Sequence, residues 1–171
     1  MTVSVTSTAG STVALGDRLA RVVLDGEPLS RLSPLQEADR DHAVHDLAAE
    51  SRFHPTGKAA HLGPFVLHLS IQEGRLVLDV RDAQDRPLVG FGLALGPFRR
   101  MIKDYELLVD SYEKAVAEGR EARIQAIDMG RRGLHNEGAS LLMERLKGKV
   151  EMDLDTARRL FTLLCVMHQR A

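Results

Sequence analysis

Three consecutive segments in the middle of the chain alternate apolar and polar residues, and they constrain the fold more than any other feature. They are Phe65–Ile71, Arg75–Arg81 and Leu88–Leu95. A period of two is typical of a strand that buries only one face. A fourth, shorter strand is expected at Arg18–Leu24, closed by the turn-forming pair Asp25–Gly26. The sequence therefore predicts a small, mainly antiparallel sheet of four strands.

The turn between the first two of these strands sets the predicted register. With Glu73–Gly74 as a two-residue hairpin loop, His68 falls opposite Asp79 on the face that points away from the core. Gly90 and Gly92 of the next strand share that face and carry no side chain. We therefore expect this open face to accept a ligand, a protein partner or a second copy of the chain. A cross-strand ion pair is the simpler interpretation of His68 and Asp79, and a catalytic dyad is the alternative.

The first predicted helix begins at a capping box. Ser33 can cap it, Pro34 suits the first helical position, and Gln36 stands where the box takes Glu or Gln. The helix is expected to run to about Ser51. Because divalent metal sites usually draw ligands from several elements, we interpret its polar side as a solvated face rather than a metal site. The polar side consists of two carboxylates and two histidines: Asp39, His42, His45 and Asp46.

Two further helices are expected later in the chain. One opens at Gly96, carries an apolar stripe as far as Val116 and stops at Gly119. The last helix is capped by Asp155 or Thr156. Its residues are apolar on more than one side, so we expect it to pack against several neighbours.

The stretch Ile124–Lys149 has helical spacing and carries the most distinctive polar pattern. One continuous helix would align four polar residues beside its apolar stripe. A break near Gly133 would destroy that alignment. As a catalytic pair, His135 would be the general base and Asp128 its orienting group. The alternative is a satisfied hydrogen-bond network that fixes helix register. The four residues follow at i, i+3, i+4 and i+7: Asp128, Arg131, Arg132 and His135.

Three Arg-Arg pairs are the candidate ligand-binding residues. Two of the pairs fall near the beginning of predicted helices, where the helix dipole disfavours a cation. An anionic ligand would remove this conflict, and so would pairing with nearby acidic residues. Both interpretations stay open. The acidic residues that could pair with these arginines are Asp104, Asp128, Glu137, Glu144 and Asp155. The pairs are Arg99–Arg100, Arg131–Arg132 and Arg158–Arg159.

Length and composition fit one domain. A chain of 171 residues with 44% hydrophobic content can bury one core. Residues 1–17 are rich in Ser, Thr, Gly and Ala and lack the blocks of a secretory signal, so we expect a disordered tail. Residues 18–171 should form a single α+β domain, with about four helices packed on one face of the sheet. The lone cysteine, Cys165, lies among apolar residues and is expected in the core.

Charge and motifs exclude several classes of function. A net charge of −1 argues against general nucleic-acid binding and against an anionic membrane surface as partner. No apolar run reaches the ~20 residues of a membrane span. The sequence contains neither a Walker loop nor a dinucleotide fingerprint, and it indicates no cofactor and no metal site. A single cysteine favours a reducing compartment, so we expect a cytoplasmic protein.

Four blocks resemble the signature blocks of an uncharacterised alphaproteobacterial protein family of the UPF type. The resemblance covers most of the chain after the tail and is specific because the blocks are long. It implies a cytoplasmic single-domain protein, and it transfers no activity, cofactor or catalytic residue. The blocks are Ala126–Gly138, Leu154–His168, Gly96–Tyr105 and Leu67–Ile71.

Two classes of function follow from these patterns. The first is a non-enzymatic interaction or regulatory protein that binds an anionic or phosphorylated ligand at its arginine-rich helix ends. The second is a hydrolase or phosphoryl-transfer enzyme, with His135 as base, Asp128 as orienting group and Arg131 and Arg132 as an anion clamp. Geometry separates them, since an enzyme needs these groups to converge on an open, concave pocket.

Overall fold

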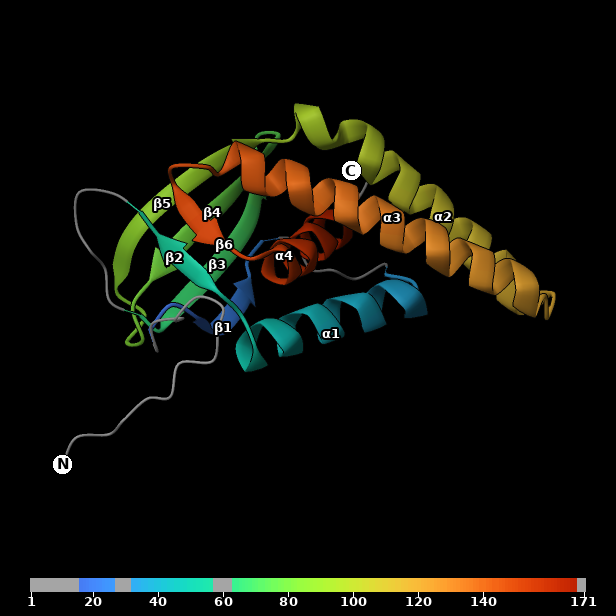
Figure 1. Ribbon diagram of the computed structural model, residues 1–171, viewed down its shortest axis with the longest axis horizontal. Helices are drawn as coiled ribbons and strands as arrows, with labels where there is room; N and C mark the ends of the chain where they lie inside the picture. The colour runs from blue at the N-terminus through green and yellow to red at the C-terminus, as the bar shows by residue number, and fades with distance from the viewer. Residues whose placement is uncertain (1–15, 27–31, 57–62, 169–171) are drawn as a thin grey trace, which may run out of the picture.

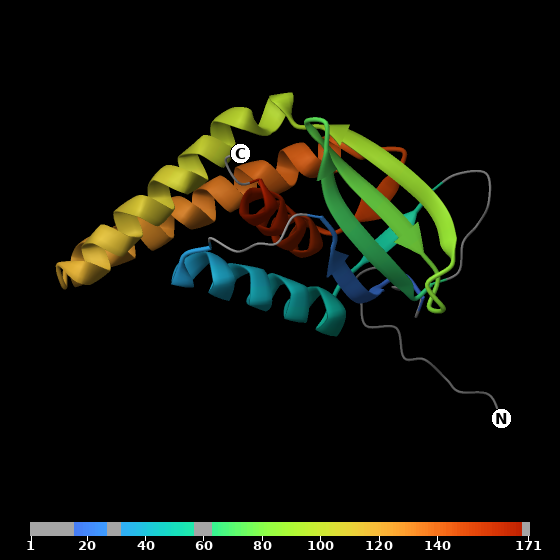
Figure 2. The same ribbon diagram turned by 180° about the vertical axis from the view of Figure 1, so that it is seen from behind.

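The computed structural model describes residues 16–26, 32–56 and 63–168. Helices cover one face of a four-stranded sheet, as the predicted α+β class requires, and Figure 2 shows the other face of β3, β4 and β5 without a helix in front of it. Residues 1–15 of the expected tail lie outside the described residues. Asp17 accepts a hydrogen bond from the Phe53 backbone N–H at 3.0 Å. Among the described residues, no helix is long and apolar enough to cross a membrane.

The main sheet contains the four predicted strands. β1 pairs with β3 in parallel, and the other two pairings are antiparallel. The strand order is β1-β3-β4-β5, so β1 and β5 are the edges. The bounds are β1 (Leu19–Leu24), β3 (Phe65–Gln72), β4 (Arg75–Arg81) and β5 (Pro87–Ala94).

The predicted hairpin register is confirmed. His68 pairs with Asp79, and Leu69 pairs with Leu78, both leucines being 1% exposed. Glu73 and Gly74 form the two-residue turn with positive φ angles of 51° and 72°. That turn matches the right-handed twist of the flanking strands, although it requires an unusual conformation of a glutamate.

The described residues form four α-helices, which lie on the covered side of the sheet, and a 3-10 turn at Gly96–Phe98 leads into the second (Figure 1). Ser33 caps the first helix through the predicted capping box with Gln36. α2 and α3 form a long hairpin that extends away from the rest of the molecule in both views. The bounds are α1 (Pro34–Ala49), α2 (Arg99–Ala117), α3 (Glu121–Arg145) and α4 (Leu154–Met167).

Helix α3 continues unbroken through Gly133, so the four polar residues of its central stretch do lie along one helix. A Cβ atom at Gly133 would meet nothing within 4 Å. At Gly138 it would lie 2.4 Å from the Phe161 ring, so this glycine allows α3 and α4 to pack closely. Of the three glycines in α3, which are Gly130, Gly133 and Gly138, Gly138 is the one that close packing requires.

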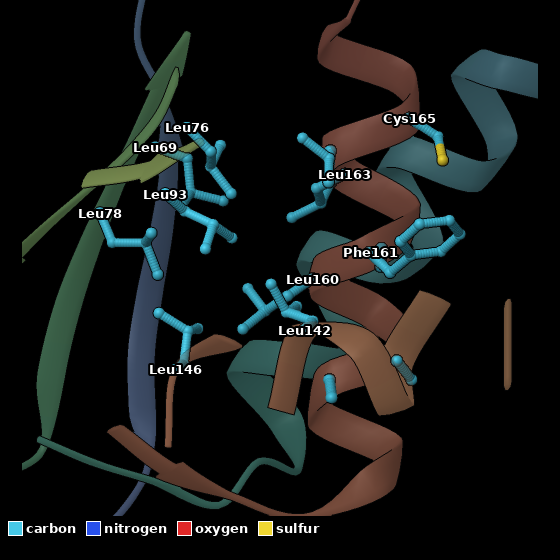
Figure 3. Close-up of a cluster of buried hydrophobic side chains, with 14 of the residues drawn as sticks. Leu69, Leu76, Leu78, Leu93, Leu142, Leu146, Leu160, Phe161, Leu163 and Cys165 are labelled. Carbon is cyan, nitrogen blue, oxygen red and sulfur yellow. The ribbon is translucent and has the colours of Figure 1, made fainter. Parts of the chain in front are cut away.

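The core lies between the inner face of the sheet and helices α3 and α4 (Figure 3). Leucines of β3, β4 and β5 point toward Leu142 of α3, toward Leu146 directly after that helix, and toward Leu160 and Leu163 of α4. Helix α4 packs against both α1 and α3, which explains why it is apolar on several sides. Cys165 is buried in this core, as predicted, and burial raises the pKa of its thiol.

Several local predictions were wrong. Two short strands that were not predicted, β2 (Phe53–Pro55) and β6 (Val150–Met152), pair antiparallel. Each has three residues, too few for a period of two to be evident. Asp153 caps α4, accepting a hydrogen bond from the Thr156 N–H. Val116 is 51% exposed, because the end of α2 buries Ala115 instead.

Candidate functional site

A pocket opens where α1, α3 and α4 meet. Its volume is about 240 Å³. Three helices contribute because α4 lies between the other two (Figure 1). The lining includes four arginines and two histidines against two aspartates, and consists of Asp39, His42, Ala43, Asp46, Arg131, Arg132, His135, Arg158, Arg159 and Thr162.

One wall of the pocket is built around Asp39 of α1. Arg131 of α3 donates to one of its carboxylate oxygens at 2.5 Å, and the Tyr105 hydroxyl of α2 donates to the other at 2.9 Å. Asp39 is only 11% exposed. Burial opposes the charge of Arg131, but the Asp39 carboxylate outweighs it and holds the arginine pKa above its ordinary value. Burial, followed by Asp39, raises the pKa of Tyr105. This network ties three helices together.

His135 lines the pocket and is 8% exposed. Its Nδ1 donates to the backbone carbonyl of Arg131 at 2.8 Å, because a carbonyl oxygen can only accept. Nε2 therefore carries the lone pair of the neutral ring. The rings of Tyr105 and Phe161 contact the imidazole edge to face. Burial lowers the pKa of His135, which favours the neutral form.

The remaining arginines of the pocket are held less firmly. Arg159 donates to the backbone carbonyl of Glu50 at 3.1 Å and lies 3.8 Å from Asp46. Arg158 reaches Asp155 only at 3.5 Å, and its buried Nε has no hydrogen-bond partner among the described residues. Within the described part of the chain, Arg132 forms no hydrogen bond or ion pair. The pocket therefore holds more positive charge than its own carboxylates balance.

Three of the predicted site residues lie outside this pocket. Asp128 is 3.9 Å from Arg131, and the group that orients His135 is the Arg131 carbonyl instead. The pairing of Asp128 with His135, one of the two alternatives weighed above, is not formed, because seven residues along a helix separate them by two turns. Arg100 pairs with Asp104 and Glu137, which were among the expected partners. Arg99 is exposed and does not line the pocket.

The open face of the sheet carries a second polar cluster, with different pairing from that expected. His68 bonds Asp25 at 2.7 Å through Nδ1 and Asp85 at 2.8 Å through Nε2, rather than Asp79. Asp79 instead accepts two hydrogen bonds from Arg81. The hydrogen bond from His68, with the nearby Arg81, lowers the pKa of Asp85. The turn that carries Asp85 brings it over His68, and strand register alone does not reveal this.

Sequence reasoning missed the contribution of α1 to the pocket. Asp39, His42 and Asp46 were expected on a solvated face, but they line the pocket beside the buried residues Ala43 and Leu47. The available signal was their spacing, which places them along the edge of the apolar stripe. Among the described residues, no group of three or more His, Cys, Asp or Glu side chains is arranged to hold a metal ion.

The fold and site define an α+β protein with an arginine-lined pocket between helices. This chain belongs to the uncharacterised protein family UPF0262, whose model matches residues 16–170. A UPF0262 protein of Granulibacter bethesdensis is 63% identical over 92% of this chain and 93% of its own length. A UPF0262 protein of Acidiphilium cryptum is 63% identical over 90% of this chain and 94% of its own length. One of Maricaulis maris is 50% identical over 91% of this chain and 96% of its own length. No solved structure gives a significant match.

Proposed function

We propose that this protein binds a small anionic ligand of the phosphorylated class in the pocket between α1, α3 and α4. It would act as a cytoplasmic interaction or regulatory protein. One observation carries the proposal. Four guanidinium groups from two helices converge on a pocket that contains only two carboxylates. Because like charges repel, an anion bound among them would relieve an unfavourable arrangement.

The chemistry of the lining favours a phosphoryl group. Guanidinium groups match the oxygens of phosphate with paired donors, and they stay charged at physiological pH. Arg132 and Arg158 are the ligand contacts, because they lack strong partners among the described residues. Arg131 is held by α1, and Arg159 by the carbonyl of the residue that ends it, so these two arginines shape the site. The volume of about 240 Å³ lies below the roughly 300–1,000 Å³ of drug-sized pockets, which favours a small ligand.

Thermal unfolding with and without inorganic phosphate tests this proposal. Phosphate at about 100 times its dissociation constant should stabilise the wild type by about 2.7 kcal/mol, relative to sodium chloride at equal ionic strength. The double variant Arg132→Met with Arg158→Met should lose this effect. Arg99→Met, an exposed helical arginine outside the pocket, is the matched control and should keep it. A wild type that responds equally to phosphate and chloride would rule the site out.

Catalysis in the same pocket is the second candidate, as a hydrolase or phosphoryl-transfer enzyme. The tautomer of His135 favours it, because Nδ1 is held by a carbonyl and Nε2 is left as a neutral base. Arg131 and Arg132 would then act as the anion clamp. Turnover of a panel of phosphate monoesters that falls strongly in His135→Gln would support this candidate. Phosphate binding without turnover of any ester would support the binding protein.

A further inference from the structure

Strand β5 is an edge of the main sheet with an unused row of backbone groups. It spans eight residues and pairs with β4 on one side only. Among the described residues, no hydrogen bond reaches the other side of its backbone. A strand of this length is long enough to accept a further strand.

The hydrogen-bond pattern identifies the residues of the free edge. The Leu95 N–H donates to the Gly74 carbonyl at 3.1 Å, so these residues form a hydrogen-bonded pair. Such pairs alternate along an antiparallel ladder, which makes Leu93 and Phe91 the next residues bonded to β4. The residues between them point their N–H and C=O groups outward: Gly90, Gly92 and Ala94.

The free edge lacks the usual protection against strand addition. Natural edges are blunted by lysines, inward charges, β-bulges or prolines within the strand. The register irregularity of β5 lies at its beginning, between Pro87 and Val89, outside the stretch Gly90–Ala94. From Pro87 to Leu95 the chain has no charged residue, and its single proline stands at the first position. The opposite edge differs, since β1 carries Arg21 and its Leu19 N–H donates to the Ser51 hydroxyl.

We propose that β5 pairs antiparallel with β5 of a second copy of this chain, around a two-fold axis at Gly92. Two-fold symmetry places each residue near the axis opposite itself or a close neighbour, so any charge there would face a like charge. The uncharged sequence of β5 removes that repulsion, and this self-compatibility points to a second copy as the occupant.

The resulting contacts agree with the exposure of β5. Gly92 would face its own equivalent, and Gly90 would face Ala94 of the second copy, each pair exchanging two backbone hydrogen bonds. On the inner face, Phe91 would lie opposite Leu93 of the second copy. Phe91 and Val89 are only partly buried in the single chain, and the added strand would cover them.

Sedimentation equilibrium of the full chain tests the pairing. The wild type should be a dimer at micromolar concentration, and Gly92→Pro should be a monomer. Proline removes only an outward N–H, since the Gly92 N–H takes no part in the β4 ladder, and edge strands tolerate proline. Gly92→Ala is the matched control and should stay dimeric, because an added Cβ would meet nothing within 4 Å.

A second variant separates loss of pairing from loss of folding. Gly92→Lys keeps the backbone N–H but places two like charges at the axis, so it should also be monomeric, with dimer restored at high salt. Circular dichroism and thermal unfolding should show that both monomeric variants are folded. A monomeric wild type across the concentration range, or a dimeric Gly92→Pro protein, would overturn the proposal.

Discussion

The two polar clusters of this molecule contain similar residues but balance their charges differently. On the open face of the sheet, His68 is bonded to two aspartates, and Arg81 is bonded to Asp79 and Asp85. In the helical pocket the four arginines outnumber the two aspartates. In the first cluster the polar groups pair with one another, whereas the second is left with cationic groups that its own carboxylates do not neutralise.

This difference separates a structural role from a binding role. A cluster whose donors and acceptors are matched stabilises the elements that carry it, and removing one member leaves the others unpaired. A cluster with surplus charge of one sign should contain residues that contribute little to the stability of the fold. Removing such a residue should weaken ligand binding much more than it destabilises the protein. Within the pocket the two kinds of arginine are neighbours in sequence, since Arg131 is tightly paired and Arg132 is not.

The largest effect is expected from Arg131→Met. The substitution would leave Asp39 nearly buried with Tyr105 as its remaining donor, so the free energy of unfolding should fall by about 2–4 kcal/mol. Urea unfolding measures this change. Adding Asp39→Asn to the variant should recover part of the loss, because it removes the unpaired charge. A loss below about 0.5 kcal/mol, the range of ordinary surface substitutions, would show that this pair is not structural.

A smaller effect is expected from His68→Gln on the sheet. An amide cannot place one nitrogen against each of two carboxylates on opposite sides as the imidazole ring does, so Asp25 and Asp85 would lose their shared partner. Because both carboxylates are partly exposed, the free energy of unfolding should fall by only about 1–2 kcal/mol. Urea unfolding beside Arg131→Met compares the clusters directly. A loss larger than that of Arg131→Met would reverse the predicted order.

The pH dependence of stability should report on His135. Burial lowers its pKa in the folded protein below the ordinary value of 6.5, so the unfolded chain binds its proton more readily. The contribution of His135 to the free energy of unfolding is therefore present above pH 6.5, and it is lost as the pH falls toward the pKa of the folded protein. One proton adds a slope of at most about 1.4 kcal/mol per pH unit. His135→Gln should reduce the slope measured in urea unfolding, and an unchanged slope would contradict this assignment.

The smallest effect on stability is expected from Arg132→Met. This residue is exposed and, among the described residues, has no hydrogen-bond or ion-pair partner, so the free energy of unfolding should change by less than about 0.5 kcal/mol. Removing one of several converging cations should leave the ligand-free protein unchanged or slightly more stable. Destabilisation similar to that of Arg131→Met would show that both arginines are structural.

Local patterns were enough to predict most of the elements. The alternating segments and the Glu73–Gly74 turn determine the hairpin register, because a slip by one residue would turn Leu69 and Leu78 outward. Ser33 and Gln36 mark the start of α1 through bonds that lie within four residues. The continuity of α3 could not be predicted, since the cost of its glycines depends on what packs against them.

Only the tertiary structure decided which polar residues meet. Asp39 and Arg131 are separated by 92 residues, and no local spacing relates them. His68 likewise takes its partners from Asp25 and from the turn at Asp85, because that turn folds over the neighbouring strand. Sequence periodicity determines which side of a helix or strand faces the core, whereas long-range packing determines which charged groups lie opposite one another. The surplus of positive charge in the pocket arises only when α1, α3 and α4 are brought together.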